Sequence, residues 1–119
     1  MAKVLVLDDV FDAVNLMKRI LEMAGHEVTG FTEEEDALKF VENNKVDLAI
    51  LDIKLKKMTG VEVLAEMKKT APSVRAIMLT GYPPVETAQA SLKLGANEYC
   101  VKPIDNEELE EKVARVLEE

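Results

Sequence analysis

Three aspartates, a threonine and a lysine follow short apolar runs of this sequence, and their side chains suit phosphate chemistry. Asp8 and Asp9 come after "KVLVL", and Asp52 comes directly after "LAIL". Thr80 and Lys102 follow two later runs, "VRAIML" and "EYCV". Carboxylates that are held together repel one another, so they favour a hard cation such as Mg²⁺, which prefers oxygen ligands.

A carboxylate in such a site can also attack phosphorus and form an aspartyl phosphate. The transferred phosphoryl group carries negative charge, which an ammonium group and hydrogen-bond donors stabilise. Lys102 would supply the ammonium and Thr80 a hydroxyl, while Gly81 would let a backbone N–H approach a phosphate oxygen. Each residue alone also has a common structural explanation, such as a helix cap or a turn. The functional interpretation therefore depends on a fold that brings them together.

The elements that would position these residues alternate along the chain. Apolar, β-branched runs predict strands at 3–7, 27–31, 46–51, 74–79 and 98–101. Helical spacing of apolar residues predicts helices at 10–24, 32–44, 60–72, 83–95 and 105–119. We expect capping boxes at the start of the second and last helices, from Thr32 to Glu35 and from Asp105 to Glu108.

This alternation is typical of an α/β fold in which helices cover both faces of a parallel sheet. Ligands of such folds bind at the carboxyl ends of the strands, near a switch in strand order. Four of the five predicted strand ends carry a polar side chain to this edge, and only the end near Phe31 and Thr32 does not. The pattern therefore predicts one site for a metal and a phosphoryl group.

Composition limits the class of protein. The chain has 119 residues, of which 48% are hydrophobic and 32% charged, and this fits a single domain over 1–119. A net charge of −8 disfavours nucleic acid and anionic membranes as direct ligands, because both attract basic surfaces. Cys100 is the single cysteine, so no intrachain disulfide forms. The first ten residues resemble neither a signal peptide nor a membrane span, and we expect a cytoplasmic protein.

The ordered set Asp8-Asp9, Asp52, Thr80 and Lys102-Pro103 resembles the receiver domain of two-component response regulators, in its stand-alone, chemotaxis-regulator-like form. The resemblance covers essentially the whole chain. It implies a flavodoxin-like (βα)5 sheet with strand order 2-1-3-4-5. It also implies a signalling protein rather than a turnover enzyme. We expect no effector domain after residue 119, so that output runs through protein contacts or onward phosphotransfer.

The resemblance implies a role for each site residue. Asp52 would accept a phosphoryl group from a phosphohistidine on a sensor histidine kinase or a phosphotransfer protein. Mg²⁺ would be held by three carboxylates and one backbone carbonyl, those of Asp8, Asp9, Asp52 and Lys54. The phosphoryl-binding and switch residues would be Thr80, Gly81, Lys102 and Tyr99.

The resemblance further implies a cis peptide bond before Pro103 and a surface on which the kinase docks. The docking candidates lie on the first predicted helix and after Lys102; they are Phe11, Ala13, Asn15, Leu16, Pro103 and Ile104. Lys54 and Tyr82 should flank the path of an attacking water, so we hypothesise that both tune the lifetime of the phosphoryl group.

Some positions depart from the usual pattern of the family. Leu55 and Lys56 stand where Met-Pro is common, and the missing proline removes a restraint on this loop. Gly81 replaces a more usual alanine or serine, and Ile104 replaces a common phenylalanine. None of these changes removes a reacting group.

Two other classes of protein use a similar topology or the same ions. A Mg²⁺-dependent phosphatase with an aspartyl nucleophile typically carries a D-x-D motif on its first strand and a cap over the substrate, whereas this chain has adjacent aspartates. A flavin-binding module needs a glycine- and hydroxyl-rich phosphate loop after the first strand, where this chain has the acidic "DDVFDAV". Turnover of a small phosphoester would indicate the first class, and a yellow colour on purification the second.

Overall fold

The computed structural model describes residues 2–119 except 82–89, 91 and 94. Its elements are β1 (Lys3–Leu7), α1 (Phe11–Met23), β2 (Glu27–Phe31), α2 (Glu34–Asn43), β3 (Leu48–Asp52), α3 (Gly60–Thr70), β4 (Arg75–Thr80), β5 (Glu98–Val101) and α5 (Asn106–Leu117). Tyr82 and most of the helix predicted at 83–95 lie outside the described residues. No helix in the described part is long and apolar enough to cross a membrane.

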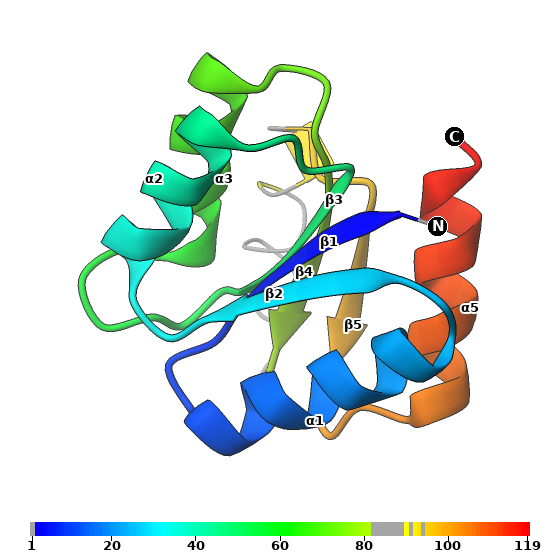
Figure 1. Ribbon diagram of the computed structural model, residues 1–119. Coiled ribbons are helices and arrows are strands. Elements are labelled where there is room, and N and C mark those ends of the chain that lie inside the picture. Colours follow the sequence, from blue (N-terminus) through cyan, green and yellow to red (C-terminus); the bar gives the residue numbers. More distant parts are fainter. Residues whose placement is uncertain (1, 82–89, 91, 94) are drawn as a thin grey trace.

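The five strands form one parallel sheet in the order β2-β1-β3-β4-β5 (Figure 1). This confirms the α/β class and the flavodoxin-like strand order. β3 lies in the centre of the sheet, and all five of its residues are buried. A strand covered on both faces must be apolar at successive positions, which explains why "LAIL" is a continuous run.

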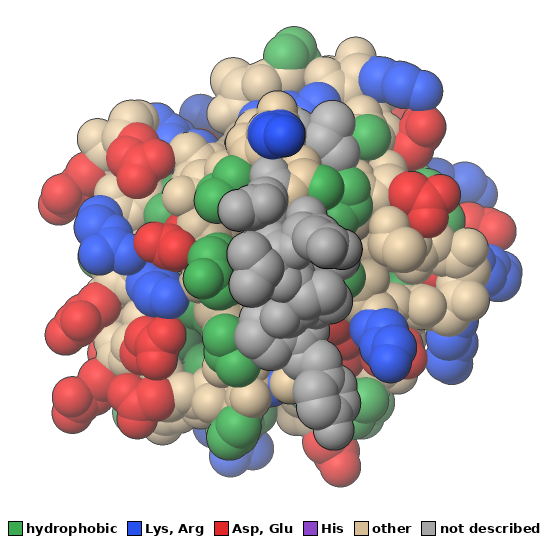
Figure 2. Space-filling view, turned by 180° about the vertical axis from the view of Figure 1, so that it is seen from behind, with side chains coloured by type: hydrophobic (Ala, Val, Ile, Leu, Met, Phe, Trp, Pro, Cys, Tyr) green, Lys and Arg blue, Asp and Glu red, His purple; other side chains and the backbone are tan. Residues whose placement is uncertain are grey.

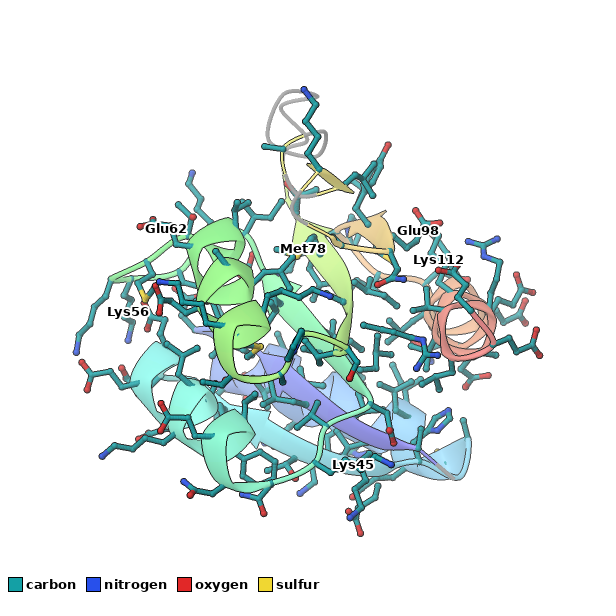
Figure 3. The ribbon with its side chains drawn as sticks, turned by 90° about the horizontal axis from the view of Figure 1, so that it is seen from above. Lys45, Lys56, Glu62, Met78, Glu98 and Lys112 are labelled. Atoms are coloured by element: carbon teal, nitrogen blue, oxygen red, sulfur yellow. The ribbon has the colours of Figure 1, made fainter. Side chains whose placement is uncertain are left out.

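Helices cover both faces of the sheet, as Figures 1 and 3 show. α1 and α5 pack on one face, over strand residues that include Val4, Val6 and Ile50. α2 and α3 pack on the other face, over the alternate residues, such as Leu5 and Leu51. Two apolar layers therefore hold the strands, and the carboxyl ends of the strands emerge at one edge between them.

The starts of the helices differ in part from the predictions. The capping box predicted at 32–35 is wrong, because α2 begins only after Glu33 and no side chain caps it. A capping box lies instead at α3, where the Thr59 hydroxyl accepts from the Glu62 N–H and the Glu62 carboxylate accepts from the Thr59 N–H, both at 3.1 Å. At α5 the structure supports half of the predicted box: the Asp105 carboxylate accepts the Glu108 N–H at 3.1 Å, so Asp105 caps the helix as predicted.

Candidate functional site

Three of the predicted site residues lie at the ends of central strands and are buried. Asp8 follows β1 and is fully buried, while Asp52 and Thr80 are the last residues of β3 and β4 and are 5% and 4% exposed. The strands predicted to end at residues 51 and 79 extend one residue further in the structure. Asp52 pairs with Leu79 of β4, and Thr80 pairs with Val101 of β5. The sheet therefore holds the backbone at these positions.

Lys102 reaches this group from the end of β5. Its Nζ donates hydrogen bonds to Oδ2 of Asp8 at 2.7 Å and to Oδ2 of Asp52 at 3.1 Å. Its backbone N–H donates to the carbonyl of Thr80 at 2.7 Å. The peptide bond between Lys102 and Pro103 is cis, which confirms the expectation from the resemblance. One lysine thus pairs with two buried carboxylates from different strands.

The other carboxylate oxygens accept hydrogen bonds from nearby backbone. Oδ1 of Asp8 accepts from the Val10 N–H at 2.9 Å, and Oδ1 of Asp52 accepts from the Lys54 N–H at 3.1 Å. Buried carboxylates are costly unless they are paired and hydrogen-bonded, and both of these are. These contacts fix the direction in which each carboxylate points.

The charges of the site shift the pKa values of two of its groups. Burial raises the pKa of Asp52; the Lys54 hydrogen bond and the Lys102 charge lower it, the Asp8 charge raises it, and the net shift is upward. Burial lowers the pKa of Lys102, but its contacts with Asp8 and Asp52 raise it by more. Lys102 therefore stays cationic at neutral pH, and Asp52 is a more basic carboxylate than an exposed aspartate.

The acidic residues of the site also fit a metal ion. Asp8, Asp9 and Asp52 each offer a carboxylate oxygen, and these atoms lie within 4.8 Å of one another. Asp9 is only half-buried, so the group is open to solvent on its side. Oxygen-only ligands with room for water match the preference of Mg²⁺. The donor set therefore fits the cation that the sequence predicts.

Tyr99, on β5, and Gly81, directly after β4, belong to the same part of the sheet but take no part in the ionic contacts of Lys102. Tyr99 is half-buried on β5, opposite Met78 of β4. Lys112 of α5, labelled in Figure 3, donates a hydrogen bond to the Tyr99 carbonyl at 2.8 Å, and its Nζ lies 5.9 Å from the centre of the Tyr99 ring. Gly81 follows Thr80 and is exposed.

The docking candidates divide between two hollows beside α1. Four of them share a groove of about 250 Å³ with Met17, Ile20 and Lys102; they are Ala13, Leu16, Pro103 and Ile104. Phe11 and Asn15 line a second hollow between α1 and the end of β2. Phe11 and Leu16 are 65% and 51% exposed. The larger groove therefore opens beside the lysine of the acidic site.

Two residues that contact the backbone near Asp52 were missed in the sequence. A Cβ on Gly60 would collide with the carbonyl of Asp52, so the chain can close over the end of β3 only with glycine there. Glu34 is buried, and its carboxylate accepts the backbone N–H groups of Lys57 and Met58. The sequence does not indicate that Glu34 is buried, because it is one of three consecutive glutamates with no distinguishing spacing.

Comparison with known families decides what kind of domain this is. The response regulator receiver domain family matches residues 4–114. The chain belongs to this family. The receiver domain is a signalling domain of two-component systems, which favours this class over the phosphatase and flavin alternatives.

Relatives of this receiver domain include short and long proteins. It is 30% identical over 115 residues to the sporulation initiation phosphotransferase F of Bacillus subtilis, covering 97% of the chain and 93% of that protein. It is 34% identical over 115 residues to the alkaline phosphatase synthesis transcriptional regulatory protein PhoP of the same organism, covering 97% of the chain but 48% of that protein. It spans only 26% of the transcriptional regulatory protein ZraR of Salmonella typhimurium, at 32% identity.

Solved structures show the same fold. A CheY-like receiver domain protein from Methanospirillum hungatei JF-1 superposes with a TM-score of 0.94 at 36% identity, covering 99% of this chain and 94% of the other. The Vibrio cholerae chemotaxis protein CheY4 superposes with a TM-score of 0.92 at 30% identity, covering 98% of each chain. These similarities extend over the whole sheet and its helices.

Proposed function

We propose that this receiver domain accepts a phosphoryl group on Asp52 from the phosphohistidine of a sensor histidine kinase, and then changes its protein partners. The observation that carries the proposal is the contact of Lys102 with both Asp8 and Asp52, beside the half-buried carboxylate of Asp9. Three carboxylates and one lysine form a site that still carries negative charge. Such a site favours a divalent cation and, with it, an anionic phosphoryl group.

The residues divide the chemistry of the transfer among them. An oxygen of Asp52 forms a bond to phosphorus while the phosphorus–nitrogen bond of the phosphohistidine breaks and the ring nitrogen keeps the electron pair. Lys102 and the Thr80 hydroxyl stabilise negative charge on the phosphoryl oxygens, with the Gly81 N–H nearby. Mg²⁺, when bound to Asp8, Asp9, Asp52 and the carbonyl of Lys54, would neutralise part of the same charge.

The conformational change would follow from the same contacts. Lys102 binds carboxylates in the structure described here, and a phosphoryl group on Asp52 would offer it new acceptor oxygens. Thr80 would move toward the phosphoryl group, and Tyr99 would turn inward behind it. Because Lys112 of α5 contacts Tyr99, this movement would alter the face formed by β5 and α5.

The kinase would dock at the groove between α1 and the segment after Lys102. Ala13, Leu16 and Ile104 give the groove an apolar lining, and Pro103 sits beside the lysine of the site. A helix of the kinase bound there would lie next to the edge that carries Asp52. The exposed Phe11, with Asn15, would extend the contact.

Residues 1–119 would act as one domain in the cytoplasm, through protein partners and without turnover of a small substrate. In the view of Figure 2, acidic and basic side chains are interspersed over the described surface. Such a surface, with a net charge of −8, is unsuited to direct binding of nucleic acid or anionic membranes. The downstream target is therefore expected to be a protein.

The proposal is tested with a small acyl phosphate as phosphoryl donor. In the presence of Mg²⁺, the intact mass should rise by one phosphoryl group, and Asp52→Asn should abolish the increase. Asp36→Asn, at an exposed aspartate of α2, is the matched control and should be phosphorylated like the wild type. Phosphate on another residue, or none even with a competent kinase, would contradict the proposal.

A further inference from the structure

Glu34 is a buried charged residue that the proposed chemistry does not use. The buried polar or charged residues in the described part of the chain are Asp8, Glu34, Asp52 and Thr80. The other three belong to the acidic site, whereas Glu34 lies at the start of α2 and is 1% exposed. A carboxylate buried outside a catalytic cluster needs its own set of donors.

Those donors come from the loop that follows Asp52. Oε2 of Glu34 accepts the N–H of Lys57 at 2.6 Å and the N–H of Met58 at 2.9 Å. Burial raises the pKa of Glu34, but hydrogen bonds from its own N–H and from these two amides, together with the charge of Lys57, lower it by more, so the net shift is downward. Glu34 is therefore ionised at neutral pH, and its hydrogen bonds are of the strong, charge-assisted kind.

Backbone hydrogen bonds hold the base of the loop between β3 and α3, both within the loop and to β4. The Ile53 N–H donates to Leu79 at 2.9 Å, the Gly60 N–H donates to Ile53 at 2.8 Å, and Lys54 pairs with Thr59. The apex of the loop, residues 55–58, lies beyond these contacts. There the two amides bonded to Glu34 tie the backbone to a different element, 23 and 24 residues earlier in the chain.

These two hydrogen bonds, called the tether below, act where the loop lacks the proline that commonly restrains it. Lys56 occupies the position at which receiver domains commonly carry proline, and its side chain is exposed at the outside of the molecule (Figure 3). Leu55 and Met58 also pack against the core between α2 and α3, but apolar packing has little directionality. Hydrogen bonds to two successive amides fix the orientation of the peptide planes as well as their position.

We propose that Glu34 is a positioning residue, which holds this loop so that the Lys54 carbonyl and the Asp52 carboxylate keep the arrangement that binds Mg²⁺. The inference rests on the proposed function, because it assigns to Glu34 a part in the metal site of the phosphoacceptor. Glu34 touches neither the metal ligands nor Asp52. It acts through the backbone of residues 54–58.

The first test compares Mg²⁺ affinity in two variants. Glu34→Gln keeps the shape of the side chain but removes its charge and places an amide donor near the N–H of residue 34 itself. By calorimetric titration, Glu34→Gln should bind Mg²⁺ about tenfold more weakly, the lower end of the effect of residues that orient metal ligands. Glu35→Gln is the matched control, because Glu35 is exposed and its carboxylate lies 3.4 Å from the Lys57 ammonium instead of on the loop backbone.

Phosphorylation kinetics separate positioning from general damage to the fold. With acyl phosphate, Glu34→Gln should need about tenfold more Mg²⁺ to reach half its maximal rate. The maximal rate itself should stay within about twofold of the wild type, since Asp52, Thr80 and Lys102 are unchanged. A folded Glu34→Gln protein with wild-type Mg²⁺ affinity would overturn the inference.

A second measurement uses the wild type alone and decides the matter even if the variant does not fold. The Lys57 and Met58 amides should be protected from hydrogen exchange. Coupling between two sites is equal in both directions, so if the Glu34 hydrogen bonds strengthen Mg²⁺ binding, bound Mg²⁺ should strengthen the hydrogen bonds by the same factor. Added Mg²⁺ should therefore slow the exchange of these two amides further. Unprotected amides, or protection that Mg²⁺ leaves unchanged, would overturn it. If the wild type binds no Mg²⁺ and is not phosphorylated, the proposed function fails too; if it does both, only the role of Glu34 is in question.

Discussion

The Nζ of Lys102 lies 3.1 Å from Oδ2 of Asp52, although fifty positions separate the two residues in the chain. The contact links the end of the central strand, β3, to the segment after the edge strand, β5. Lys102 also holds Asp8, so one cation serves two buried carboxylates, with Asp9 close by. The site therefore carries an excess of negative charge until a metal binds. Removing its cation and removing one of its negative charges should then have opposite effects on stability.

Removing the lysine should destabilise the metal-free protein. Lys102→Met leaves Asp8 and Asp52 buried without their cation, and we expect a loss of about 3 kcal/mol in the free energy of unfolding at neutral pH. Urea unfolding in buffer containing a chelator measures it. Lys69→Met, which removes an exposed pair with Glu66, should cost less than about 0.5 kcal/mol. Equal losses in the two variants would contradict the pairing described for Lys102.

Neutralising the phosphoacceptor should have the opposite effect. Folding raises the pKa of Asp52, so the ionised carboxylate is less stable in the folded state, and Asp52→Asn should raise the melting temperature at pH 7 without Mg²⁺. The gain should vanish below pH 3.8, the ordinary pKa of aspartate, where Asp52 is protonated in both states. Added Mg²⁺ should stabilise the wild type more than Asp52→Asn. If calorimetry in buffer containing a chelator finds Asp52→Asn less stable than the wild type, the proposed effect of the Asp52 charge is wrong.

Gly60 should tolerate no side chain. A methyl group there would collide with the carbonyl of Asp52, and Gly60→Ala should lower the free energy of unfolding by about 2 to 3 kcal/mol. Gly81→Ala is the matched control, since no heavy atom of the described residues lies within 4 Å of its Cβ position and its φ is not positive. We expect a change of less than about 1 kcal/mol there. Chemical denaturation of both variants checks the pair.

The tether through Glu34 should make stability depend on pH. Folding lowers the pKa of Glu34, so its contribution is fully present above the ordinary value of 4.5 and is lost as the pH falls through the folded pKa. The difference in unfolding free energy between wild type and Glu34→Gln should therefore shrink below pH 4.5. Glu35→Gln should show no such trend. A difference that stays constant with pH would mean that Glu34 acts by shape and not by charge.

Local pattern was enough to predict most of the elements. The continuous apolar run before Asp52 predicts a strand covered on both faces, and alternation with helical segments predicts the parallel α/β class. The polar residues at the strand ends then fall at one edge, because parallel strands share a direction. The strand order came from the resemblance to receiver domains, since hydrophobic pattern does not distinguish one order of neighbouring strands from another.

Tertiary structure decided the contacts that no local pattern encodes. In the sequence Glu34 is one of three consecutive glutamates at a helix start, and the capping box predicted there involved Thr32 and Glu35. Its hydrogen bonds to the loop after β3 were therefore not predicted. The sequence by itself determined which side chains reach the edge of the sheet, because strand period and burial depend on near neighbours. Only the folded chain decided that Lys102 pairs with Asp8 and that Glu34 holds Lys57, because these bonds join residues that are distant in sequence and depend on how whole elements pack.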